Sequence, residues 1–394
     1  MPPKLPTLGE EMTAETSHIT RSSPTPVLGV GSVVLNAPQR DVFDNLLAVG
    51  ADRPTHDPGL ADELRTILKE GTADALAAWT ESSLWLSKSQ ITSVLRCEGQ
   101  TVAYASDPTP QPMHSATVAG IVAHRAIHLA YTHPDYVVRS YVDWALEMIL
   151  ASDPGVADFW NNASPAHQSD VIAQAMEKTV GFLDSWPPLQ DAWEPRFEVP
   201  IQVKIGKLKL AGRVDLMLGR PRPPRQTMLL ADLKTGALSD HHGLEAAFYG
   251  LLATLRSGVA PFRSVIYSIA SGEWTEPADM TPDLLRETAH TVADAVSRHV
   301  ALLMGMRDPS LTPGRYCSWC PARGTCPAAE LPARPTSSPT QPVTITPTPV
   351  PAGRSAGDTA PSNVVELPVD RDDVPPPQPE AGAPDDPDLG PFAL

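Results

Sequence analysis

Two aspartates and a lysine stand at the ends of neighbouring predicted strands, and their types are suited to chemistry. Asp215 ends the segment AGRVD, and Asp232 and Lys234 lie in LLADLK. Residues two apart in a strand face the same side, so Asp232 and Lys234 point together, next to wherever Asp215 projects. Paired carboxylates supply oxygen ligands for a hard divalent cation, and a nearby lysine can orient a water molecule or stabilise developing charge. The pattern fits metal-dependent phosphodiester hydrolysis; the alternative is a solvated strand end with an Asp–Lys ion pair.

The four cysteines form a second constellation, in which one residue is far from the other three. Cys317, Cys320 and Cys326 form a C-x2-C-x5-C pattern, and Cys97 lies 220 positions upstream. Four thiolates suit a zinc ion or an iron–sulfur cluster. A compact triplet with one distant cysteine fits a 4Fe–4S cube better than a zinc ribbon; zinc and metal-free structural thiols are the alternatives. Either metal would fasten the helix end near Cys97 to the end of the ordered domain.

A helix histidine is a third candidate. His124 lies in GIVAHRAIH, and His128 follows one helical turn later. Histidines four apart on a helix can bind zinc together, but the sequence offers no third ligand close to this pair. From the residues alone, a histidine without a metal is the alternative.

Helical periodicity dominates the first half of the chain. Helices are predicted over residues 60–79 with an interruption at Gly71, and over residues 115–131, 136–150 and 165–186. The motif Ser87-Lys88-Ser89-Gln90 predicts the cap of a short helix that ends at Cys97. Several prolines predict a loop over residues 101–116.

The pattern changes at Trp193 to the alternation that is typical of strands. The segment RFEVPIQVKIGKLKLAGRVDLMLG predicts a hairpin that turns near Gly206-Lys207. The strands MLLADLK and RSVIYSIA follow, with helices over residues 241–256 and 282–304. This order predicts an α/β fold with a small mixed central sheet flanked by helices and a helical N-terminal part.

Composition separates the ends of the chain from its middle. Proline accounts for 44 residues, about twice the average usage of about 5%. Residues 1–40 and residues 331–394 are rich in proline and small polar residues, which predicts a disordered N-terminal segment and a disordered tail around a domain at 41–330. Without an apolar leader or a run of about 18 apolar residues, the chain is expected to be cytoplasmic.

The charge balance argues against a nucleic-acid partner unless basic residues gather locally. The net charge is −16, and residues 331–394 hold nine acidic and three basic residues, so most of the negative charge lies in the rest of the chain. A nucleic-acid site would have to be a basic patch on an acidic body.

The order of these motifs resembles the core of the PD-(D/E)XK nuclease superfamily. The matching residues are GRVD at 212–215 and DLKTG at 232–236. More narrowly, the one-plus-three cysteine pattern resembles the RecB-like and CRISPR-associated exonucleases that carry an iron–sulfur cluster. The resemblance covers about residues 85–328 and implies a restriction-endonuclease-like core with an iron–sulfur staple.

The resemblance also implies roles for individual residues. Asp215, Asp232 and Lys234 would be catalytic, and Asp215, Asp232, His124 and the Leu233 carbonyl would bind Mg²⁺ or Mn²⁺. Cys97, Cys317, Cys320 and Cys326 would bind the 4Fe–4S cluster. Support or DNA contacts are implied for Glu198, Arg213, Glu245 and Tyr249. Glu245 and Tyr249 match a Q-x-x-x-Y helix pattern in which this chain has glutamate instead of glutamine.

The implied function is a metal-dependent DNA exonuclease that acts on single strands or DNA ends in recombination, repair or phage DNA metabolism. The alternative is a non-catalytic DNA-end-binding subunit of a larger nuclease or CRISPR adaptation complex. The final segment DDPDLGPFAL resembles the acidic tip of bacterial single-stranded-DNA-binding proteins, which would dock on a protein partner. The alternative is an acidic solubilising tail.

Overall fold

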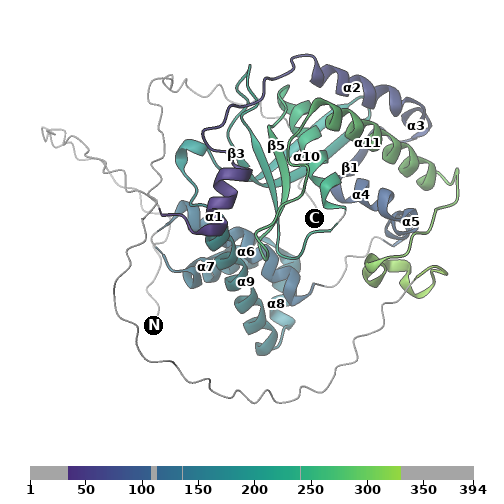
Figure 1. The fold of residues 1–394 in the computed structure, drawn as a ribbon. Coiled ribbons are helices and arrows are strands. Elements are labelled where there is room, and N and C mark those ends of the chain that lie inside the picture. Colours follow the sequence, from purple (N-terminus) through teal and green to yellow (C-terminus); the bar gives the residue numbers. More distant parts are fainter. Residues whose placement is uncertain (1–33, 108–112, 135, 240, 330–394) are drawn as a thin grey trace, which may run out of the picture. The chain divides into compact units, whose positions relative to one another are not determined.

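The computed structural model describes residues 34–107, 113–134, 136–239 and 241–329, which form a mixed sheet flanked by helices (Figure 1). The helices are α1 (Ala37–Asp41), α2 (Leu60–Gly71), α3 (Ala73–Ala78), α4 (Lys88–Arg96), α5 (Glu98–Ser106), α6 (Ser115–Thr132), α7 (Val138–Ser152), α8 (Pro154–Asn162), α9 (Pro165–Ser185), α10 (His242–Ser257) and α11 (Pro282–Leu303). The shorter helical turns are η1 (Val42–Leu46), η2 (Asp191–Trp193), η3 (Arg315–Trp319) and η4 (Pro321–Gly324). The strands are β1 (Leu84–Ser87), β2 (Arg196–Ile205), β3 (Leu208–Leu218), β4 (Leu229–Lys234) and β5 (Arg263–Ser268).

The sheet is built around β3. One edge of β3 pairs with β2, and the other edge pairs with β1 in its first part and with β4 in its last part. β1 runs parallel to residues 208–211 of β3, whereas β4 pairs antiparallel with residues 216–218. Residues 212–215 lie between these two segments, at a fork where β1 and β4 diverge from β3. β5 continues the sheet in parallel beyond β4. The fork places the GRVD motif where side chains from β1, β3 and β4 can meet.

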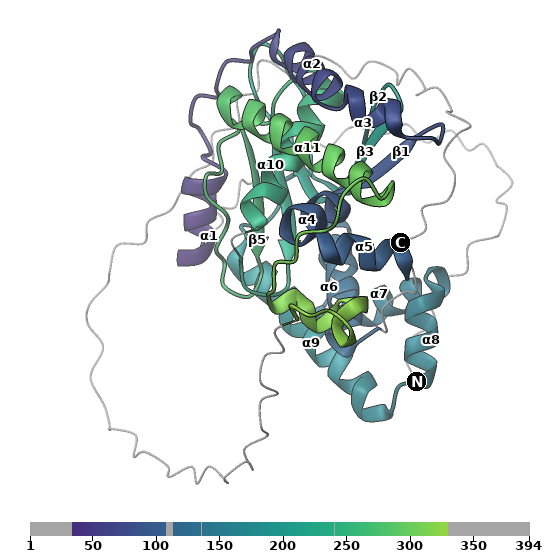
Figure 2. The same ribbon diagram turned by 90° about the vertical axis from the view of Figure 1, so that its right-hand side faces the viewer.

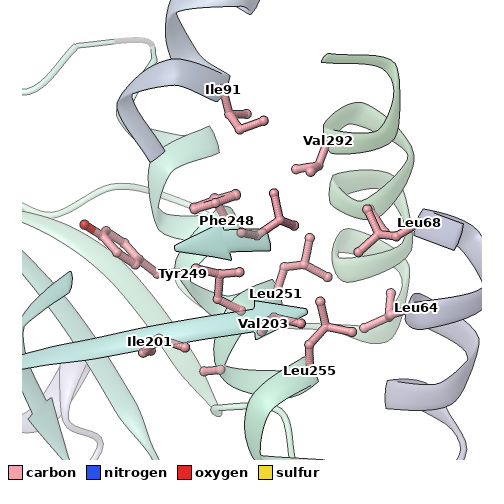
Figure 3. Packing of buried hydrophobic residues seen from close by; sticks show 14 of the residues in the cluster. Leu64, Leu68, Ile91, Ile201, Val203, Phe248, Tyr249, Leu251, Leu255 and Val292 are labelled. Carbon is pink, nitrogen blue, oxygen red and sulfur yellow. The ribbon is translucent and has the colours of Figure 1, made fainter. Parts of the chain in front are cut away.

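Helices cover both faces of the sheet. On one face, α2, α4, α10 and α11 form an aliphatic core with the strands, and Phe248 and Leu251 of α10 lie at its centre (Figure 3). On the other face, Ile127 of α6 and Phe182 of α9 pack with η1 against β3, β4 and β5. The sheet is therefore buried on both sides, which explains why every residue of β4 before Lys234 is buried, including Asp232.

Helices α6 to α9 pack on one another as well as on the sheet. Their mutual contacts form a separate apolar cluster that includes Val122, Tyr141 and Val171. Figures 1 and 2 both show this group of helices gathered on the side of the strands away from α2 and α11. This packing positions α6, and α6 carries His124 to the fork.

In the hairpin of β2 and β3, the regular alternation of side chains between the two faces of the sheet is interrupted at one place. Val214 and Leu216 are two apart in β3, yet they pack in the cores on opposite faces of the sheet. The flanking pairs of the ladder set Glu198 of β2 opposite Asp215 of β3 at this point. Glu198 has φ 52°, a left-handed conformation that costs a non-glycine residue about 1–3 kcal/mol. The kink turns both carboxylates away from regular alternation.

The structure bears out the predicted α/β fold and corrects three details of it. The predicted loop at residues 101–116 is wrong in its first part, because α5 continues to Ser106. Glu98 at the start of α5 is buried against Arg307 and the backbone N–H of Ser310, which the local sequence could not reveal. The short strand β1 and helix α8 were also missed.

The chain termini lie largely outside the described residues. Residues 1–33 of the expected disordered segment and all of residues 331–394, with the acidic end, belong to this undescribed part. Helix α1 already begins at Ala37, a few residues before the expected domain boundary at residue 41. In the described part of the chain, no helix has the length and apolar character needed to cross a membrane.

Candidate metal centre

The fork in the sheet fixes the two aspartates of the sequence motif beside each other. Asp215 lies on β3 just before the segment that pairs with β4, and Asp232 lies on β4 just after it. The backbone N–H of Leu233 donates a 2.6 Å hydrogen bond to Oδ2 of Asp215. This bond orients the Asp215 carboxylate and leaves its other oxygen, Oδ1, directed toward α6.

Three side chains from three elements meet at that oxygen. Nδ1 of His124 on α6 lies 3.5 Å from Oδ1 of Asp215 and 3.8 Å from Oε1 of Glu198. One ligand atom from each of these residues lies within 4.8 Å of the other two. Two carboxylate oxygens and an imidazole nitrogen at this spacing suit a divalent cation such as Mg²⁺ or Mn²⁺. We call this set the metal group.

Without a cation, the imidazole of His124 supplies the compensating positive charge. Burial by itself lowers the pKa of His124, but the adjacent carboxylates of Asp215 and Glu198 outweigh it and raise the pKa to about 10. Burial raises the pKa of Asp215 despite the nearby His124. A cation at this place therefore competes with a proton on the metal group.

Asp232 faces a second set of side chains on the α10 side of the sheet. Its Oδ1 lies 3.3 Å from Nζ of Lys88 and accepts a 3.0 Å hydrogen bond from the Tyr249 hydroxyl. Its Oδ2 forms an ion pair with Lys234. Glu245, one turn before Tyr249 on α10, lies 2.9 Å from Nζ of Lys88 and 3.8 Å from Nζ of Lys234. We call these five residues the lysine cluster.

The charges of the lysine cluster reinforce each other. Burial alone would raise the pKa of Asp232, but Lys88 and Lys234 lower it below its ordinary value. The pKa of Lys234 is raised, because the attraction of Asp232 and Glu245 exceeds the effect of burial. Both lysines in this cluster are paired with carboxylates. Asp232 is therefore ionised, although its side chain is only 4% exposed to solvent.

Gly212 allows the cluster to close. A Cβ atom at this position would lie 2.8 Å from Cε1 of Tyr249 and 3.3 Å from Leu252. The absence of a side chain lets the Tyr249 ring lie against β3 and reach Asp232. Figure 3 shows Tyr249 at the edge of the apolar cluster, with its hydroxyl directed away from the other labelled side chains.

The structure thus divides the predicted ligand set between two neighbouring groups. His124 and Asp215 belong to the metal group, whereas both oxygens of Asp232 are engaged by the lysine cluster. Glu198, for which the sequence suggested only a supporting role, joins the metal group through its carboxylate. Arg213 is half exposed, and its Nη1 lies 3.8 Å from Oε2 of Glu198.

One residue differs from the expectations drawn from sequence and another agrees with them. His128, for which the sequence offered no third zinc ligand, does not join the metal group; its ring stacks on Phe197 with centroids 4.5 Å apart. Lys88, which sequence reasoning treated only as part of a helix cap, reaches Asp232 from the first turn of α4. The unpredicted strand β1 is what brings it there, so the sequence carried no clear signal for its role.

The four cysteines line one cavity of about 390 Å³ between α5 and the segment that contains η3 and η4. Figure 2 shows this C-terminal segment, in yellow-green, next to α5. Apolar side chains such as Val102, Leu311 and Pro313 complete the walls. Burial, and to a lesser extent the three other thiols, raises the pKa of Cys320.

The spacing of the sulfur atoms bears on what the cavity could hold. In a tetrahedral zinc site with Zn–S bonds of about 2.3 Å, the sulfurs lie about 3.8 Å apart. Among the described residues, which include all four cysteines, no three of these sulfurs lie within 4.8 Å of one another. The cavity brings the four thiols to one place, although no three of them are spaced as ligands of a single ion in the described structure.

Comparison with known proteins gives one family match, and this match spans the residues of both sites. The sequence model of the PD-(D/E)XK nuclease superfamily matches residues 86–327. The match starts in β1, ends just beyond Cys326, and contains the metal group, the lysine cluster and all four cysteines. A search of curated proteins gives no match for the chain.

The raised pKa of His124 predicts a pH-dependent stability of the metal-free protein. The folded value of about 10 exceeds the unfolded value. The contribution of His124 is therefore complete below about pH 6.5 and is lost as the pH rises toward 10. His124→Gln should flatten the fall in unfolding free energy between these limits. Urea unfolding in EDTA measures it, and equal pH profiles for the variant and the wild type would contradict the prediction.

Proposed function

Since the chain belongs to the PD-(D/E)XK nuclease superfamily, we propose that it is a Mg²⁺- or Mn²⁺-dependent deoxyribonuclease that works as an exonuclease on single strands or DNA ends. The observation that carries the proposal is the meeting of a three-ligand metal group with the Asp232–Lys234 pair across one fork of the sheet. A structural ion pair at a strand end would not require His124 and Glu198 beside it.

In this proposal, His124, Glu198 and Asp215 hold the cation, and Asp232 and the Leu233 carbonyl complete its ligands. When bound, the cation neutralises phosphate charge and makes a coordinated water more acidic. The hydrogen bond from the Leu233 N–H keeps Asp215 oriented before the cation arrives, which lowers the cost of ordering the site.

Lys234 acts as a hydrogen-bond donor. Because its pKa is raised, it is an ammonium ion at neutral pH. It can therefore orient the attacking water through its N–H groups and stabilise negative charge on the phosphate, as charge-assisted bonds do. The Tyr249 hydroxyl holds Asp232 from the opposite side.

Cationic side chains at the fork bear on whether a chain with a net charge of −16 can bind DNA. Lys88, Lys234 and the half-exposed Arg213 offset three of the four carboxylates at the fork, so a bound divalent cation would make the fork positive toward a phosphate group. The preference for ends or single strands rests on the similarity to RecB-like and CRISPR-associated exonucleases. Recombination, repair or phage DNA metabolism is the corresponding setting, in the cytoplasm.

We also propose that Cys97, Cys317, Cys320 and Cys326 bind a 4Fe–4S cluster. Support comes from the cavity that all four cysteines line and from the one-plus-three cysteine pattern in the sequence. The cluster would be structural. Cys97 follows the last residue of α4, the helix whose first residue is Lys88, so ligation anchors the far end of a helix that contributes to the lysine cluster.

Replacing Asp232 or Lys234 should abolish cleavage without unfolding the domain. We expect Asp232→Asn and Lys234→Ala to lower the rate by about 100-fold or more, as the loss of charge stabilisation does elsewhere. The assay is digestion of end-labelled single- and double-stranded DNA with Mg²⁺ or Mn²⁺, and circular dichroism checks the fold.

Two results would count against this assignment. Full activity of purified Asp232→Asn protein would remove Asp232 from the chemistry. Tight binding of DNA ends by a wild-type protein that never cleaves them would favour the alternative, a non-catalytic end-binding subunit of a larger nuclease or CRISPR adaptation complex.

Loss of one cysteine should remove both iron and stability. Anaerobically purified wild-type protein should be brown and contain about four iron atoms per chain. Cys320→Ser should lose the colour, and its thermal midpoint should fall by more than about 5 °C, because ligation energy is folding energy. Iron analysis and thermal melting test this prediction. A colourless wild-type protein with stoichiometric zinc would refute the cluster.

A further inference from the structure

Lys88 occupies a position in the lysine cluster that the family motif does not explain. It follows β1 directly and is the first residue of α4, and its side chain is 17% exposed. Because β1 shares an edge of β3 with β4, the end of β1 points into the same fork as Asp232. Lys88 is therefore a second ammonium group beside the carboxylate that Lys234 already pairs with.

Lys88 is held in place by Glu245. Their Nζ and Oε2 atoms are 2.9 Å apart, closer than Lys88 is to Asp232. Glu245 is mostly buried, at 15% exposure, and a carboxylate there needs a cationic partner. A glutamine at this position would carry no such charge. The glutamate that departs from the sequence pattern is thus matched by a lysine 157 positions earlier in the chain.

The ammonium group of Lys88 has capacity left after these contacts. A lysine has three N–H donors, and among the described residues one of them is donated to Oδ1 of Asp232. Glu245 pairs with the ammonium group by charge at 2.9 Å, and its Oε2 has no hydrogen-bond partner among the described residues. The group also lies 5.1 Å above the Tyr249 ring, which limits the directions it can take. The backbone N–H groups of the first turn of α4 give the surroundings of Lys88 a positive potential. Lys88 therefore keeps N–H donors that no side chain among the described residues accepts, although two carboxylates lie beside it.

We propose that Lys88 binds a non-bridging phosphate oxygen of the substrate strand, and that Glu245 is a positioning residue that holds Lys88 for this contact. The inference rests on the proposed nuclease function and adds a phosphodiester subsite on the α4 side of Asp232. If the Asp232 carboxylate binds the metal ion, Lys88 keeps Glu245 as its partner and therefore stays at the fork. Its N–H donors are then available to the substrate DNA strand.

The competing explanation is that Lys88 only neutralises Glu245. A double-variant cycle separates the two. In Lys88→Met, both explanations predict a loss, because Glu245 is left unpaired. In Lys88→Met combined with Glu245→Gln, the unpaired charge is gone. Asp232 keeps its ion pair with Lys234 in this variant, so a purely neutralising lysine predicts recovery to wild-type behaviour. A phosphate-binding lysine predicts that the defect persists together with a shallower salt dependence.

The measurement is kcat/KM on an end-labelled single strand with Mn²⁺ over a range of salt concentrations. We expect Lys88→Met and the double variant to lose about 10- to 100-fold, the effect of one charge-assisted hydrogen bond. The slope against salt should become shallower by about 0.7, the value for one phosphate contact on a single strand. Glu245→Gln should lose less, and Lys88→Arg should keep the wild-type slope.

Lys209→Met is the matched control. Lys209 is a half-buried lysine of β3 whose Nζ lies 4.5 Å from the Trp85 ring centroid, and it is six residues, about 20 Å, from Asp215 along the strand. This variant should keep wild-type kcat/KM and salt slope. Circular dichroism melting confirms that each variant is folded.

Recovery of both activity and salt slope in the double variant would overturn the proposal. Failure of the nuclease function itself is distinguishable, because wild-type protein would then show no metal-dependent cleavage. In that case fluorescence anisotropy with the same labelled strand still decides the matter for Lys88. An unchanged salt slope of binding in Lys88→Met would refute the phosphate contact, and a shallower one would support it.

Discussion

Four carboxylates, those of Glu198, Asp215, Asp232 and Glu245, gather at a fork in a sheet that is covered on both faces. Bringing this much like charge into a partly buried place is costly unless cations compensate it. The protein meets the constraint with His124 on one side and Lys88 and Lys234 on the other. The neighbouring elements are arranged so that these three residues reach the fork.

The two sides of the fork are compensated differently, and this asymmetry bears on function. The lysine cluster is neutralised by permanent charges, whose pairing keeps Asp232 ionised. The metal group depends on a histidine proton, which a divalent cation can replace. The metal group is thus the side on which a cation can replace a proton rather than a lysine, and Glu198 has a left-handed backbone conformation at this place.

Helix α4 links this fork to the cysteine cavity. It begins at Lys88 in the lysine cluster and ends next to Cys97, with Ser87 and Gln90 forming a reciprocal cap at its start. A group held by the four cysteines would fix one end of α4 while the cap and β1 fix the other. The family match over residues 86–327 spans both the fork and the cysteine segment.

The sequence by itself determined the α/β order of elements, the hairpin at Gly206, and the Asp215, Asp232 and Lys234 candidates, because alternation, turn residues and charged strand ends are local signals. His124 became a candidate only through the resemblance to a nuclease family. Tertiary structure alone decided that Glu198 joins the metal group and that Lys88 pairs with Glu245. Those contacts depend on a four-residue strand and on a kink between distant segments, and neither leaves a periodic pattern in the chain. Charge compensation across a fork is a property of three-dimensional proximity, which local sequence patterns do not encode.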